Sequence, residues 1–110
     1  MKVQYQPELA QRKPLAAIAE AATSILEKAI GSPAARVTAT WGLRTDERGR
    51  PLIQLTISDA LSGQGSTEFS PEELQPPDKA RRRFYRFWGD ILQEASQRLI
   101  RKLETMQVES

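Results

Sequence analysis

The chain has 110 residues, a formal net charge of +2, and 27% charged against 39% hydrophobic residues, proportions typical of one folded domain. Cysteine and histidine are both absent, which excludes disulfides, thiolate or imidazole metal sites and Ser-His or Cys-His nucleophiles, so we expect no metal, no cofactor and no enzymatic activity. No apolar stretch is long enough to cross a membrane and no signal-peptide core follows the first residues, so we expect a cytoplasmic protein without membrane contact.

The first helix is expected to follow a short N-terminal arm. Residues 1–13 show no sustained hydrophobic period, which predicts an arm with a short extended piece at Val3 and Tyr5. From Pro14 apolar residues recur at intervals of three and four, as on one side of a helix, and Gly31 predicts the end of that helix. The apolar stripe consists of Leu15, Ile18, Ala22, Ile25, Leu26 and Ala29.

Three strands are expected in the middle of the chain. The hydrophobic period changes to two over residues 36–44 and again over residues 53–58, which is typical of half-buried strands. The polar residues 45–50, with sequence TDERGR, predict a hairpin connection between them. A third short strand is expected over residues 66–69, after a glycine-containing turn. These strands together predict an antiparallel three-stranded meander.

A long helix is expected at the C-terminus. Ser70 and Glu73 are spaced as a helix-capping box, two prolines end that first turn, and Asp78 can cap the helix that follows. We therefore predict an α+β fold, a two-layer α-β-β-β-α arrangement with both helices on one face of the meander, as a single domain over residues 14–110. The stripe of the last helix consists of Phe84, Trp88, Ile91, Leu92, Ala95, Leu99, Leu103 and Met106.

This order of elements is also that of the double-stranded RNA-binding domain. In that family a basic cluster at the start of the second helix contacts phosphates, and residues 79–81 (Lys-Ala-Arg) would occupy such a place. Residues 63–66 (Gly-Gln-Gly-Ser) loosely resemble the glycine turn that precedes it. However, Pro76 and Pro77 intervene, the final helix is too long, and no histidine-bearing loop joins the first strands. The resemblance concerns the order of elements alone, and no family is assigned on it.

The charges are unevenly distributed at the start of the last helix. Five acidic and no basic residues lie in residues 59–78, whereas five basic and no acidic residues lie in residues 79–86. The two blocks can neutralise each other within the fold. On a helical wheel Phe84 and Trp88 face the core, while most of the arginines lie on the opposite side, so a combined cation and base-stacking surface is disfavoured.

The leading functional hypothesis is a non-enzymatic protein-interaction module, an adaptor or an oligomerisation module, that docks through its long C-terminal helix. The partner is expected to be another protein or a second copy, because the helix outruns the sheet and carries apolar residues away from its main stripe. The candidate interaction residues are Phe87, Arg82, Arg83, Arg86 and Ile100.

The alternative hypothesis is a nucleic-acid-binding module that contacts the backbone of double-stranded RNA or DNA. Cations at the start of the last helix would neutralise phosphates, and binding would weaken steeply with salt. The residues for this alternative are Lys79, Arg81, Arg82, Arg83, Arg86 and Arg50.

Overall fold

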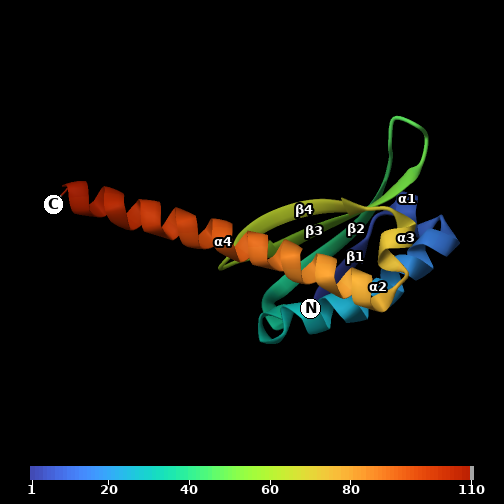
Figure 1. The fold of residues 1–110 in the computed structure, drawn as a ribbon, viewed down its shortest axis with the longest axis horizontal. Coiled ribbons are helices and arrows are strands. Elements are labelled where there is room, and N and C mark those ends of the chain that lie inside the picture. The colour runs from blue at the N-terminus through green and yellow to red at the C-terminus, as the bar shows by residue number, and fades with distance from the viewer. Residues whose placement is uncertain (110) are drawn as a thin grey trace.

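The computed structural model describes residues 1–109 of the chain, with side chains through Thr105. The predicted domain end at residue 110 and the side chain of Met106, predicted on the last apolar stripe, lie outside these described parts. The fold is α+β, with a four-stranded mixed sheet and two long helices packed against one of its faces (Figure 1). The elements in chain order are β1 (Lys2–Tyr5), α1 (Pro7–Ala10), α2 (Lys13–Ile30), η1 (Ser32–Arg36), β2 (Val37–Thr45), β3 (Pro51–Asp59), β4 (Gly63–Phe69), α3 (Pro71–Leu74) and α4 (Pro77–Glu109).

The sheet corrects the predicted three-stranded antiparallel meander. β2, β3 and β4 pair antiparallel as expected, but β1 adds a fourth strand that runs parallel to β2, with Val3 opposite Ala39 and Tyr5 opposite Trp41. The short extended piece predicted at Val3 and Tyr5 is confirmed as β1, whereas the rest of the segment 1–13, predicted as an arm, contains α1 and the start of α2. Four residues are too few to show a hydrophobic period, and the partner strand follows only after α2, so no local signal marked this pairing.

The first long helix, α2, begins and ends within one residue of the predicted bounds. α2 begins at Lys13 with Pro14 in its first turn and ends at Ile30, before Gly31 in a left-handed conformation at φ 78°. Small residues on its buried side, Ala19 and Ala22, let α4 pack closely against it.

The core lies between the sheet and these helices. Along β2 and β3 alternate residues point toward the helices, and most of them are buried, as the period of two predicted. Phe84 and Trp88 are buried, which confirms their predicted place in the core. The Phe84 ring packs edge-on against the rings of Phe69 and Trp41, at centroid distances of 5.5 and 6.4 Å.

The connection from β4 to α4 is fixed by the predicted capping box. The backbone N–H of Ser70 donates to Glu73 Oε1 at 3.0 Å, and the Ser70 hydroxyl lies 3.1 Å from the same oxygen. α4 then begins at Pro77, so that Asp78 lies in its first turn rather than at its N-cap.

α4 is longer than the sheet that it covers. Its 33 residues correspond to about 50 Å at 1.5 Å per residue. Its C-terminal part extends beyond the strands and away from the rest of the domain (Figure 1). None of the helices in residues 1–109 is long and apolar enough to cross a membrane.

Candidate binding surfaces on the C-terminal helix

The basic run at the start of α4 is divided by the fold into paired and unpaired cations. Arg81 pairs with Asp78 at 3.4 Å, and Arg83 pairs with Glu73. Among the side chains that the structure describes, no ion pair forms to the remaining three cations, which are exposed. These three residues are Lys79, Arg82 and Arg86.

Arg83 is the best-anchored of the arginines. Its guanidinium lies 4.9 Å from the centroid of the Phe69 ring, and its Nη2 lies 3.5 Å from the backbone oxygen of Glu68. Burial alone would raise the pKa of Glu73, but hydrogen bonds from Ser70 and the positive charges of Arg83 and Lys79 hold that pKa below its ordinary value. Arg83 therefore joins α4 to both α3 and β4.

Arg50, predicted as a helper in nucleic-acid binding, lies apart from the unpaired cations of α4. It is at the end of the β2–β3 hairpin and lines a hollow that also contains Asp46 and Glu72. Its nearest charged surroundings are thus acidic, and it adds little positive potential to the start of α4.

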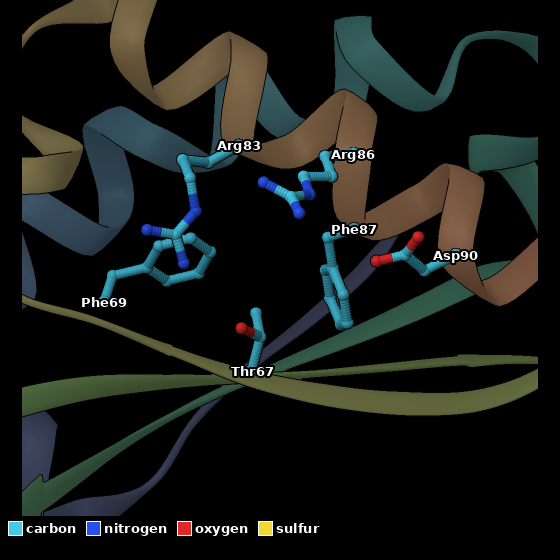
Figure 2. A pocket seen from close by; sticks show the side chains of 6 residues that line it. All are labelled: Thr67, Phe69, Arg83, Arg86, Phe87 and Asp90. Atoms are coloured by element: carbon cyan, nitrogen blue, oxygen red, sulfur yellow. The ribbon is translucent and has the colours of Figure 1, made fainter.

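A groove separates the first half of α4 from the edge strand β4. The helix crosses the strand closely at Gly65, where an added Cβ would lie 2.8 Å from Ile91 Cγ1 and 3.4 Å from Phe87 Cε1. Toward Phe69 a hollow of about 220 Å³ opens, and side chains from both elements point into it (Figure 2). Its lining residues are Thr67, Phe69, Arg83, Arg86, Phe87 and Asp90.

A second hollow of about 470 Å³ lies on the same side of α4 and shares Asp90 with the first. All of its lining residues belong to α4: Asp90, Gln93, Glu94, Gln97, Arg98 and Arg101. Arg98 Nη2 donates to the backbone oxygen of Ser62 at 2.8 Å, which ties this part of the helix to the β3–β4 turn. We call the two hollows together the strand-edge groove.

The last turns of α4 present an apolar surface of a different kind. Arg98 makes the last hydrogen bond from a described α4 side chain to the rest of the domain, and we call residues 99–109 the overhang. Leu99, Ile100 and Leu103 are 59%, 54% and 51% exposed, so this part of the apolar stripe has no partner in the fold.

The predicted interaction residues therefore lie on two surfaces. Arg83, Arg86 and Phe87 line the strand-edge groove, where Phe87 is half-buried rather than fully exposed. Ile100 lies on the overhang, about 20 Å further along the helix than Phe87 at 1.5 Å per residue. Arg82 is exposed and is not among the groove-lining residues.

A buried ion pair was not predicted as a special site. Arg36 Nε donates to Asp59 Oδ1 at 2.9 Å, with the Asp59 side chain 0% exposed and the Arg36 side chain 41% exposed. Burial would raise the pKa of Asp59, but hydrogen bonds from Arg36 and from the Leu61 backbone N–H hold it below its ordinary value. The alternation of Ile53, Leu55 and Ile57 places residue 59 on the inner face of the sheet. The sequence pattern could therefore have predicted that Asp59 is buried.

The described side chains form no group that could hold a metal ion: within residues 1–105, no three acidic side chains form such a group. The groove combines guanidinium, carboxylate, hydroxyl and ring groups at the surface, an arrangement suited to recognising a polar partner.

The fold and these surfaces define a small α+β domain with a four-stranded mixed sheet and a long C-terminal helix. In comparisons with known proteins, no family model, no curated protein and no solved structure matches the chain.

Proposed function

We propose that the protein is an interaction module that self-associates through the overhang of α4. The observation that carries this proposal is the unpartnered apolar stripe, Leu99, Ile100 and Leu103, on a helix that leaves the sheet. A second copy presents the same stripe, so a two-fold dimer would be self-complementary.

The spacing of the stripe supports a helix-to-helix interface. Leu92 and Leu99 are seven residues apart with Ala95 between them, an interval of three and then four that is typical of a coiled-coil seam. Ala95 offers close approach, and Leu103 continues the seam one turn beyond Leu99.

The expected affinity is modest. Burying the exposed parts of Leu99, Ile100 and Leu103 in both copies would contribute about 1 to 1.5 kcal/mol for each side chain. For the six side chains of a dimer the sum is about 6 to 9 kcal/mol, and the lower estimates of the association cost, about 4 kcal/mol, leave a net of about 2 to 5 kcal/mol. We therefore expect a weak, reversible dimer with a dissociation constant of about 0.2 mM or higher.

Sedimentation velocity over a wide concentration range tests this proposal. The native chain should shift from monomer to dimer as concentration rises, and Leu99→Glu should remain monomeric because each interface would bury two carboxylates. Gln97→Glu adds the same charge on the opposite side of the same helix and should dimerise like the native chain. A chain that stays monomeric at the highest concentration, or equal association by both variants, would show the proposal to be wrong.

A second candidate function rests on the unpaired cations. Lys79, Arg82 and Arg86 lie within about 60° of one another on a wheel of 100° per residue. Such a stripe could contact successive phosphates of a nucleic-acid backbone. Arg81 and Arg83 are already paired, and Arg50 lies elsewhere. Nucleic-acid binding would therefore have fewer cations available than the sequence indicated.

A further inference from the structure

β4 offers a free strand edge beside the strand-edge groove. The sheet order β1-β2-β3-β4 leaves one side of β4 without a strand partner. Because Arg83 reaches the backbone oxygen of Glu68, the main-chain groups of Glu68 lie on that free side. Main-chain groups alternate in direction along a strand, so those of Ser66 and Gln64 share the free side. A free edge of this kind is a template for one more strand.

The length of the groove matches a short extended segment. From Arg86 to Arg98 the helix rises about 18 Å at 1.5 Å per residue. A strand of five or six residues spans about 17–20 Å. β4 has seven residues and runs below this part of α4.

The charges of the groove favour an acidic occupant. Four arginines line its two hollows, together with Asp90 and Glu94, which also form no ion pair among the described side chains, so the net charge of the lining is positive but small. Arg83 is already paired with Glu73, and Arg98 is bound to a backbone oxygen. Among the described side chains no ion pair forms to Arg86 or Arg101, one in each hollow, so both cations are available to an external carboxylate.

The groove fits a polypeptide better than a nucleic acid or a second β4. Its rings offer no stacking platform, since Phe69 is buried and Phe87 packs against Gly65. Another β4 strand would bring a single acidic residue, Glu68, into the groove. An extended acidic segment can satisfy both the free main-chain groups and the two unpaired arginines.

We propose that an extended acidic segment of a partner protein adds to β4 as a fifth strand and lies in the strand-edge groove. Its main chain pairs with the N–H and C=O of Ser66 and with the N–H of Glu68, whose oxygen already accepts from Arg83, and its acidic side chains pair with Arg86 and Arg101. Since alternate residues of a strand face one side, acidic residues at every second position all face α4. This site goes beyond the proposed self-association: Arg101 also belongs to the overhang, but it lies on a different side of α4 from Leu99, Ile100 and Leu103.

The test uses the full chain, labelled with ¹⁵N, and a pool of seven-residue peptides. Each peptide has Glu at its second, fourth and sixth positions and a mixture of Thr, Val, Ser and Leu elsewhere; a matched pool has Lys in place of Glu. With the Glu pool, the amides of Gln64, Ser66 and Glu68 should shift and become protected from hydrogen exchange. The Lys pool should leave them unchanged.

Three variants connect the response to the proposed contacts. The double variant Arg86→Gln and Arg101→Gln should weaken binding by about tenfold or more, the loss expected for charge-assisted contacts. Arg48→Gln removes an exposed cation in the β2–β3 hairpin and should bind like the native chain. Ser66→Pro removes one N–H from the free edge, a change that edge strands tolerate, and should abolish the protection of β4.

Four results would overturn the proposal. These are absence of any shift with the Glu pool, equal binding of the Lys pool, shifts confined to α4, and displacement of the Glu pool by a single-stranded oligonucleotide. The last result would favour the nucleic-acid candidate instead. Self-association would change the amides of the overhang and not those of β4. If the chain does not self-associate, the shifts of the β4 amides with the Glu pool should still be seen, so the two proposals can be distinguished.

Discussion

Arg83 lies near the start of α4, where a positive charge opposes the helix dipole. The fold compensates for this position with the Glu73 carboxylate, the Phe69 ring and the Glu68 backbone oxygen. Arg86, one turn later, has no ion-pair partner among the described side chains, although it lies in the same groove. Two arginines of one basic run thus differ: Arg83 joins elements of the fold, and Arg86 forms no ion pair among the described side chains.

At the same scale, Asp59 should make stability depend on pH. The pKa of Asp59 is lower in the folded chain than in the unfolded chain. The stability that the Asp59 carboxylate contributes is therefore complete above its pKa in the unfolded chain, about 3.9, and is lost as the pH falls through its pKa in the folded chain. Asp59→Asn should cost about 1–3 kcal/mol at neutral pH, because Arg36 loses its charged partner. The difference from the native chain should shrink in acid. Urea unfolding followed by tryptophan fluorescence at several pH values measures both effects.

Glu20→Gln is the matched control for Asp59→Asn, since it neutralises an exposed carboxylate on α2. It should change the free energy of unfolding by less than about 0.5 kcal/mol. Some pH dependence should persist in Asp59→Asn, because the pKa of Glu73 is lowered as well. Equal losses for both variants at every pH would contradict the role assigned to the buried pair.

At the scale of elements, the crossing of α4 over β4 depends on Gly65. Gly65→Val should cost about 1–3 kcal/mol, the usual range for overpacking, because the new side chain would meet Ile91 and Phe87. Gln64→Val, on the outer side of the same strand, should stay within about 0.5 kcal/mol of the native chain. Thermal and urea unfolding of the two variants give the comparison.

A second substitution can show whether Gly65→Val destabilises the fold through its contact with α4 or through a change in the strand propensity of β4. Ile91→Ala added to Gly65→Val removes the atoms that the valine would meet, so the double variant should lose less stability than the two single losses summed. Strict additivity of the two changes would indicate that Gly65 and Ile91 do not share the close contact.

At the scale of the whole molecule, the acidic and basic blocks are neutralised by several different elements. Glu73 and Asp78 pair with the basic run, whereas Asp59 and Glu68 pair with Arg36 and Arg44. Twelve cations form no ion pair among the described side chains, and six of them lie along α4.

This distribution predicts weak nucleic-acid binding. In a gel shift with double-stranded RNA and DNA, we expect no complex at physiological salt, because the stripe at the start of α4 offers only Lys79, Arg82 and Arg86 without an ion pair among the described side chains. Arg82→Gln with Arg86→Gln is the diagnostic variant at low salt. A complex that persists at physiological salt, weakens steeply as salt is raised further and disappears in that variant would favour the second candidate function.

The two long helices and the hairpin of β2 and β3 could be predicted from the sequence because their signals are local. A period of three and four residues, a period of two, a capping box and well-placed Gly and Pro each depend on neighbours within a few positions. The same wheel that placed Phe84 and Trp88 in the core also indicated an apolar stripe longer than the sheet, and the structure leaves Leu99 and Leu103 exposed.

Only the tertiary structure decided the rest, because it depends on residues far apart in the chain. β1 pairs with a strand on the other side of α2, Asp59 meets Arg36 across 23 positions, and Arg83 meets Glu73 across ten. The strand-edge groove likewise exists only where α4 diverges from β4. Sequence alone therefore determined the periodic elements and their apolar sides, while the fold determined which arginines are satisfied and which stay open to a partner.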